Sequence, residues 1–466
     1  MNFYGIIAGV LGLGIFCYLS PRLKVLIAFF IMTGCFDLAP RLLFNKDIWD
    51  VGAVLLFIAW LQLAFCKVET PSQTFSYVVL IRILIGWMFV CLLWSILIYD
   101  YPALDSLKAS RQMIIGFLSF FVFLRLFSVD QGAFSFFLRS LYIITFLLLP
   151  VCIIQYIANR PLLFGLITDY GGVVRALPVF LPICLLHFWL ITSKVLTSDR
   201  VAKHEMVYAG MVIGVTALTF TRGIYITVLC MLFVMLITLK IQKRLNIRTA
   251  IILLSTSVFC VALLPFGGWG GKVINRATSG IDILFSNPGI GKHDDIDTFG
   301  GRLALTQERF GLVVEHNPVL GYGFIHENNV PNAMRAKFKY GSVIYSEEYV
   351  EKYQRGAPYV LALHSADIGW ADIVVNTGIL GLFIFILIVA SIVLNYYGHS
   401  TMIDPSAYHI RMAFFLQALA LILLMFNGNT FVVLVQIPAF MLAGYAYSSK
   451  LREETSPDSL TTAIAT

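Results

Sequence analysis

Runs of about 20 apolar residues recur along nearly the whole chain, and this feature most limits how the chain can fold. A helix of ~20 residues crosses the ~30 Å hydrocarbon core of a bilayer, where every backbone N–H and C=O must find a partner within the protein. Only 13% of the 466 residues are charged, about half the share found in soluble domains. The sequence therefore predicts an all-α integral membrane protein with about 12–13 transmembrane helices.

The predicted spans follow from these apolar runs, and the first is interpreted as a retained span because it lacks a basic n-region and a small-residue cleavage site. By residue number they are 3–20, 25–44, 51–66, 76–98, 112–128, 141–158, 176–193, 206–221, 223–240, 249–266, 371–395, 409–426 and 429–448.

Basic residues predict the orientation of the chain. The connections 21–24, 193–203 and 240–248 are rich in Lys and Arg, and alternation of the predicted spans places all three on one face. Cytoplasmic loops carry such an excess, so this face is expected to be cytoplasmic and the long segment 266–359 periplasmic. The net charge of +7 is explained in this way, and no nucleic-acid partner is expected.

The sequence predicts four parts, with one large, partly helical periplasmic loop among them. Within that loop, helices are expected over residues 300–318 and 346–356, and "NPVLGYGF" between them is expected to form a Pro/Gly turn. The parts are N-terminal transmembrane helices (1–265), a periplasmic cap loop (266–363), C-terminal transmembrane helices (364–450) and a polar cytoplasmic tail expected to be disordered (451–466).

Four ionisable residues stand out because they lie at predicted outer span ends or open the first cap helix: Arg175, Arg222, Arg302 and His364. Guanidinium donors fit phosphate oxygens, and imidazole changes its protonation most easily near neutral pH. Such a set suits a reaction in which a phosphate leaves and a hydroxyl attacks. Each residue also has a plainer interpretation, as a lipid-headgroup anchor or a helix cap.

Two further features are candidates for supporting roles. Asp367 follows His364 by one helical turn and is a candidate for orienting the imidazole, although it could equally be a solvated carboxylate. A stripe of tyrosines along the second cap helix could stack on sugar rings or form that helix's buried face; it comprises Tyr345, Tyr349 and Tyr353.

No metal or nucleotide motif is present in the sequence. There is no HExxH, P-loop, GxSxG or DxD pattern, and the eight cysteines lie in or beside apolar runs without paired spacing. We therefore expect no cofactor and no metal.

Four ordered landmarks carry a resemblance to a known family. They are "TRG" at 221–223, an Arg-led helix with a Pro–Gly-x-Gly turn at 300–324, a His-led span at 364–382, and the placement of the second and third in one large loop. In this order, in a chain of this topology, the sequence resembles the O-antigen ligase and Wzy-type O-antigen polymerase family of bacterial inner-membrane glycosyltransferases.

The resemblance implies transfer of a glycan from undecaprenyl diphosphate to an acceptor hydroxyl without metal. By motif position, His364 is similar to the family's loop histidine, proposed to activate the acceptor. Arg222 and Arg302 look like its diphosphate-binding arginines, and Arg175 resembles a further basic residue. Many members have His-Asn where this chain has His364-Ser365.

The implied partners are an undecaprenyl-diphosphate-linked oligosaccharide, an acceptor glycan or lipid A-core, and membrane lipids. A chain-length regulator or other polysaccharide assembly proteins are candidate protein partners. A polymerase of O-antigen, capsule or exopolysaccharide repeat units is favoured because many surface glycans each need their own.

Several alternatives stay open. They are a ligase to lipid A-core, transfer to protein, a scaffold whose cap binds a partner protein, and a non-catalytic polysaccharide transporter or flippase. Transporters commonly show paired halves and broken spans, and the sequence shows no paired halves.

Overall fold

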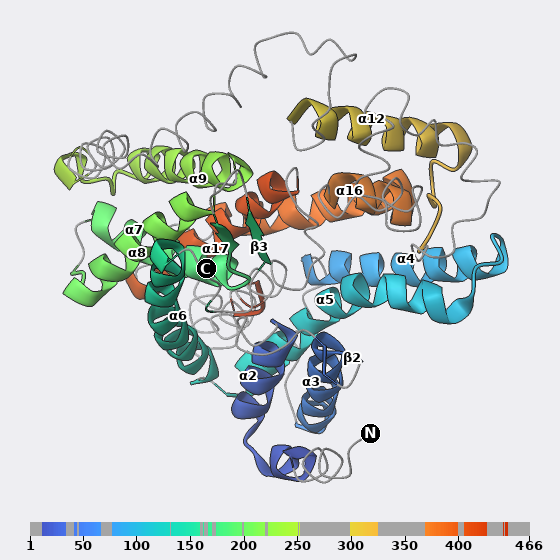
Figure 1. The fold of residues 1–466 in the computed structure, drawn as a ribbon, viewed down its shortest axis with the longest axis horizontal. Coiled ribbons are helices and arrows are strands. Elements are labelled where there is room, and N and C mark those ends of the chain that lie inside the picture. Colours follow the sequence, from blue (N-terminus) through green and yellow to red (C-terminus); the bar gives the residue numbers. More distant parts are fainter. Residues whose placement is uncertain are drawn as a thin grey trace, which may run out of the picture.

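A computed structural model provides the structure of the chain (Figure 1). It describes residues 12–33, 42–43, 46–66, 77–130, 132–158, 162, 166–169, 174–197, 200–219, 222–249, 251, 299–324, 369–398, 405–425, 441 and 443–445.

Helices dominate the described residues, and four short strands form two antiparallel hairpins. The helices are α2 (Pro21–Met32), α3 (Ile48–Ala64), α4 (Tyr77–Leu97), α5 (Ala103–Val129), α6 (Ala133–Ala158), α7 (Leu181–Thr197), α8 (Lys203–Leu218), α9 (Arg222–Ile241), α12 (Phe299–His316), α16 (Gly369–Gly398) and α17 (Pro405–Leu424). The strands are β1 (Leu42–Leu43), β2 (Lys46–Asp47), β3 (Leu166–Asp169) and β4 (Val174–Leu177).

Long apolar helices confirm the predicted fold class. Within the described residues, α4, α5, α6 and most of α9 and α16 are long and apolar enough to cross a membrane, and α3, α7 and most of α17 are shorter apolar helices. Large hydrophobic side chains stay exposed along them, with Leu147 65% and Leu229 66% exposed. Such surfaces are expected to face lipid. The protein is an all-α, multi-pass integral membrane protein.

The second predicted span, 25–44, is wrong at its C-terminal end, where residues 42–43 form β1. Helix α2 ends at Met32, and β1 already pairs with β2 at residues 42–43. Twelve residues of helix are only about 18 Å long, too short to cross the hydrocarbon core. The sequence after Thr33 contains Gly34 and Pro40, both of which disfavour continuation of a helix.

Residues 100–111 were predicted as a connection between two spans, and most of this connection is helical, because α5 begins at Ala103. One polar side chain in this first part of α5 contacts another helix. Arg111 donates from Nη1 to Asp50 Oδ2 of α3 at 2.7 Å. A helix that extends beyond the hydrocarbon region can carry such polar residues, which an apolar-run criterion does not count.

Contacts between connecting segments agree with the predicted alternation of spans. Asp50 and Arg111, which are in contact, lie in the connections 45–50 and 100–111, and alternation of the predicted spans places both connections on the outer face. The backbone N–H of Asn246 donates to the carbonyl of Leu196 at 2.9 Å, which joins two connections predicted to be cytoplasmic. Segments expected on the same side of the membrane therefore lie together.

Helix α16 lies between α12 and α4 (Figure 1), and it also contacts α17. Helix α17 packs against α7 and α9, whereas α4 packs against α5 and α3 against α2 and α5. The central position of α16 thus connects the N-terminal helices, the C-terminal helices and the cap helix α12.

Arg125, inside the apolar helix α5, holds the C-terminal end of α3. Its Nε donates to the carbonyl of Leu63 at 2.5 Å, and its Nη2 donates to the carbonyls of Ala64 and Cys66 at 2.9 and 2.5 Å. The last carbonyls of a helix have no partner within it. One arginine therefore satisfies carbonyl groups at the end of α3.

We predict that Arg125→Gln destabilises the protein by about 1–3 kcal/mol, because carbonyls at the end of α3 lose charged donors. Thermal unfolding of the purified protein in detergent measures the effect. The control is Arg139→Gln, since Arg139 is exposed on α6. Equal melting temperatures for the two variants would contradict this role.

Candidate functional site

Two of the predicted diphosphate-binding arginines begin helices. Arg302 lies in the first turn of α12, whose observed range Phe299–His316 confirms the helix predicted over 300–318. Arg222 is the first residue of α9. Helix N-termini favour anions through their free N–H groups and their dipole, so both backbone positions suit a residue that holds a phosphate.

Arg175 does not begin the seventh span as predicted. It lies in β4, paired with Thr168 of β3, and α7 begins only at Leu181. In the sequence, Gly171 and Gly172 stand between the two strands, and glycine is favoured in hairpin connections. The role of Arg175 in phosphate binding stays a prediction.

The remaining predicted site residues lie outside the described residues, and so does the helix predicted over 346–356. They are His364, Asp367, Tyr345, Tyr349 and Tyr353. In the sequence, His364 stands five residues before α16 begins at Gly369. The backbone N–H of Gly369 donates to the carbonyl of Met425 at 3.0 Å, so the start of α16 is tied to the end of α17.

In the view of Figure 1, the N-terminal end of α9 points toward the N-terminal end of α12. The other end of α12 leads into the predicted Pro/Gly turn, which the structure confirms at residues 317–324.

This turn inserts into a break in α16, and we call residues 317–324 together with residues 375–379 the interlock. The N–H of Tyr322 donates to the carbonyl of Val375 at 2.7 Å, and the N–H of Ile379 donates to the carbonyl of Pro318 at 2.8 Å. From α4, the Trp87 indole donates to the carbonyl of Thr377 at 2.8 Å. Groups freed by the break are therefore satisfied by the cap turn and by α4.

Gly378 makes the break possible. Its φ of 68° and ψ of −175° lie in a region that is essentially restricted to glycine. A Cβ at this position would lie 2.0 Å from the carbonyl oxygen of Val319. Only a residue without a side chain fits, since the backbone of the cap turn fills that space.

Aromatic residues hold the turn from the side of α4. The ring centroid of Tyr322 lies 6.1 Å from that of Tyr99, which stacks on Tyr101 at 5.7 Å. Asn317 donates from Nδ2 to the Tyr99 hydroxyl at 3.2 Å. Burial, with smaller contributions from Tyr99 and Glu315, raises the pKa of Tyr322 to about 12. The phenol is therefore neutral and uncharged at the pH of the cell.

Buried polar residues on α12 and α16 were not singled out from the sequence. Arg309 is 1% exposed on α12, and Asp372 and Asn376, one turn apart on α16, are 2% and 7% exposed. Arg309 and Val313, four residues apart, lie on one buried face of α12. In the sequence, Arg309 follows Arg302 by seven residues, about two helical turns, and this spacing was the signal that could have identified it.

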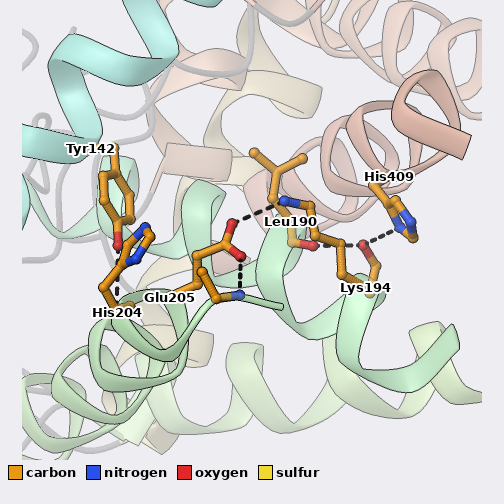
Figure 2. Close-up of polar contacts among 8 residues, drawn as sticks. Tyr142, Leu190, Lys194, His204, Glu205 and His409 are labelled. Atoms are coloured by element: carbon orange, nitrogen blue, oxygen red, sulfur yellow. Dashed lines mark hydrogen bonds and ion pairs between the residues drawn. The ribbon is translucent and has the colours of Figure 1, made fainter. Parts of the chain in front are cut away.

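A second polar cluster joins α6, α7, α8 and α17 away from these residues (Figure 2). Glu205 accepts from Lys194 Nζ and from the Ala202 N–H, each at 2.9 Å. Ser193 and His409 Nδ1 are 2.9 Å apart. In the predicted topology this cluster is cytoplasmic, and its mutually paired side chains join helix ends. In the part of the chain that the structure describes, no three His, Cys, Asp or Glu side chains gather as around a metal.

We predict that Arg309→Ala destabilises the docking of α12 by about 2–5 kcal/mol, because the side chain is 1% exposed and its removal loses packing contacts and leaves a cavity. The matched control on the same helix is Gln307→Ala, since Gln307 is exposed. Thermal unfolding and hydrogen exchange across α12 measure the difference. Identical behaviour of the two variants would show that the buried guanidinium contributes nothing.

Comparison with known proteins supports the resemblance. Residues 207–386 match a family model described as O-Antigen ligase. No curated protein matches the chain. The matched segment runs from α8, through α9 and α12, to a point in α16 beyond Gly378. Over residues 207–386, the chain is therefore similar to the O-antigen ligase family.

Proposed function

We propose that the protein is a glycosyltransferase that moves a glycan from undecaprenyl diphosphate to an acceptor hydroxyl without a metal. The observation that carries this proposal is the family match, because residues 207–386 contain "TRG", the Arg302 helix with its turn, and the His364 segment together. The interlock supports it, since it attaches the helix bearing Arg302 to the helix that follows His364.

The proposed chemistry assigns one step to each kind of side chain. The bond between the anomeric carbon and the diphosphate oxygen breaks, and its electron pair leaves with undecaprenyl diphosphate. Arg222 and Arg302 hold the diphosphate and the charge that develops on it. The acceptor oxygen bonds to the anomeric carbon while the His364 imidazole takes its proton. Arg175 is a further candidate for the diphosphate, Asp367 for orienting the imidazole, and the three cap tyrosines for sugar stacking.

The chain geometry is compatible with this assignment. Five residues of extended chain span at most about 18 Å, so the covalent connection keeps His364 within that distance of Gly369. The hydrogen bond from Gly369 to Met425 holds this end of α16 in place. The proposal requires that Arg222 and Arg302 reach the same cleft.

A polymerase of O-antigen, capsule or exopolysaccharide repeat units remains the first choice, with the cell inner membrane as its location and the cap loop on the periplasmic side. Transfer to lipid A-core is the second choice, and the description of the matching family model favours it. A chain-length regulator or other polysaccharide assembly proteins are proposed as partners.

A transporter without chemistry is the competing class, and the break in α16 bears on it. Broken spans in transporters leave half-helix ends that hold substrates or ions. Here the carbonyls of Val375 and Thr377 and the N–H of Ile379 are occupied by the protein's own groups. The groups at the break therefore attach the cap turn to α16 and are not free to hold a substrate or an ion. This favours an enzyme with a fixed cap over a transporter.

We predict that His364→Ala lowers kcat by roughly 10²–10⁴-fold, the range for loss of a general base, while expression and folding are unchanged. The assay uses purified protein in nanodiscs with a lipid-linked glycan, and mass spectrometry measures the products. His204→Ala is the control, because His204 is exposed on α8. Retained transfer by the His364 variant would remove the catalytic assignment.

We predict that Arg222→Lys and Arg302→Lys each impair transfer, because a point charge does not replace a bidentate fork of donors. Arg82→Lys serves as the control, since Arg82 is an exposed residue of α4. The same assay reads all three variants. A wild-type rate for Arg222→Lys or Arg302→Lys would show that the substituted residue does not hold the diphosphate.

The products distinguish the two transfer reactions. Longer glycans that stay on undecaprenyl diphosphate indicate a polymerase. Glycan attached to lipid A-core, supplied as the acceptor, indicates a ligase. If neither product forms but lipid-linked glycan crosses the bilayer of a vesicle, the protein is a transporter.

A further inference from the structure

The interlock places two backbones in direct contact. A Cβ on Gly321 would lie 2.4 Å from the carbonyl oxygen of Val375, and one on Gly378 would lie 2.0 Å from that of Val319. Real Cβ contacts under 3.0 Å essentially never occur. Both glycines also have positive φ, 64° and 68°, which side chains disfavour. The cap turn and α16 therefore each need a glycine where they meet: Gly321 in the turn and Gly378 in the helix.

A third glycine fixes the opposite side of the turn. A Cβ on Gly323 would lie 2.7 Å from the carbonyl oxygen of Cys91 and 2.7 Å from Ser95 Cβ, both in α4. The turn is thus held between α4 and α16, without room for a side chain on either side. Sliding of α12 along α16 would break the hydrogen bonds of Tyr322 and Ile379 together.

We propose that Gly321 and Gly378 are positioning residues for transfer: the interlock sets the register of α12 on α16, and thereby the separation of Arg302 from the segment that precedes α16. This inference rests on the proposed function, which places the diphosphate at Arg302 and the proton acceptor at His364. Neither glycine touches a substrate in this account.

The energetic reason is that transfer needs its reacting groups within a narrow range of distance. A misplacement of about 1 Å can cost roughly 10²-fold in rate even when the change lies far from the chemistry. A Cβ inserted at Gly378 must displace the backbone of Val319 by about that amount, because a backbone atom cannot rotate away. Donor binding at the arginines is affected less than the rate of the bound complex.

Gly378→Ala and Gly321→Ala test the proposal, with Gly311→Ala on α12 and Gly86→Ala on α4 as controls, since a Cβ at either control position meets nothing within 4 Å. We expect kcat to fall roughly 10²-fold in both interlock variants, with the KM for the lipid-linked donor changed by less than about threefold. The controls keep the wild-type kcat. Hydrogen exchange at Tyr322 and Ile379 accelerates only in the interlock variants, whereas α6 to α8 keep their protection.

If an inserted Cβ prevents folding, a milder substitution that removes one hydrogen bond to the interlock still tests the proposal. Trp87→Phe keeps an aromatic ring, smaller than the indole, but removes the N–H donor to the Thr377 carbonyl, and we expect kcat to fall about 3- to 10-fold. Trp60→Phe is its control, because Trp60 is 38% exposed on α3.

Each outcome decides the proposal. A wild-type kcat in a folded glycine variant or in Trp87→Phe overturns it, and so does a loss of kcat without faster exchange at the interlock. A large rise in KM with unchanged kcat would assign these residues to donor binding instead. If His364→Ala keeps transfer while the glycine variants lose it, the proposed chemistry fails and the interlock is required for another reason.

Discussion

The architecture depends on one contact between backbones, where the turn after α12 fills the break in α16. A broken helix in a membrane exposes carbonyl and N–H groups that lipid cannot satisfy. The cap turn and Trp87 provide the missing partners, and Gly378 gives the backbone its unusual path. The cap helix is therefore fixed to the membrane domain at backbone precision, and α16 connects it to α4 and α17 (Figure 1).

This contact gives a physical reason for the two glycine-containing landmarks of the sequence. "NPVLGYGF" and "NTGILGL" lie more than fifty residues apart, yet their backbones pass within contact distance. One follows the helix of Arg302, and the other follows the segment of His364. In the proposed reaction, Arg302 binds the diphosphate and His364 is the general base.

The sequence predicted the membrane class, helix α12 and the position at which it ends. It also predicted the spans that correspond to α3 through α9, and most of these helix ends lie within a few residues of the predicted limits. Those features follow from local apolar patterns and from Asn-Pro and Gly signals. The break in α16 could not be predicted, because "TGILGL" inside an apolar run is indistinguishable from an ordinary helical stretch. Its cause is a turn distant in sequence. The burial of Arg309 and Asp372 was missed for a similar reason, since a hydropathy pattern assigns polar residues to an exposed face.

The proposed function requires that Arg222, Arg302 and His364 meet at one undecaprenyl-diphosphate site. A cryo-electron-microscopy structure of the protein with undecaprenyl diphosphate bound tests it most directly. We expect both guanidinium groups within hydrogen-bond distance of the diphosphate oxygens, and the imidazole facing the same cleft. A diphosphate bound elsewhere, or an imidazole turned toward lipid, would contradict it.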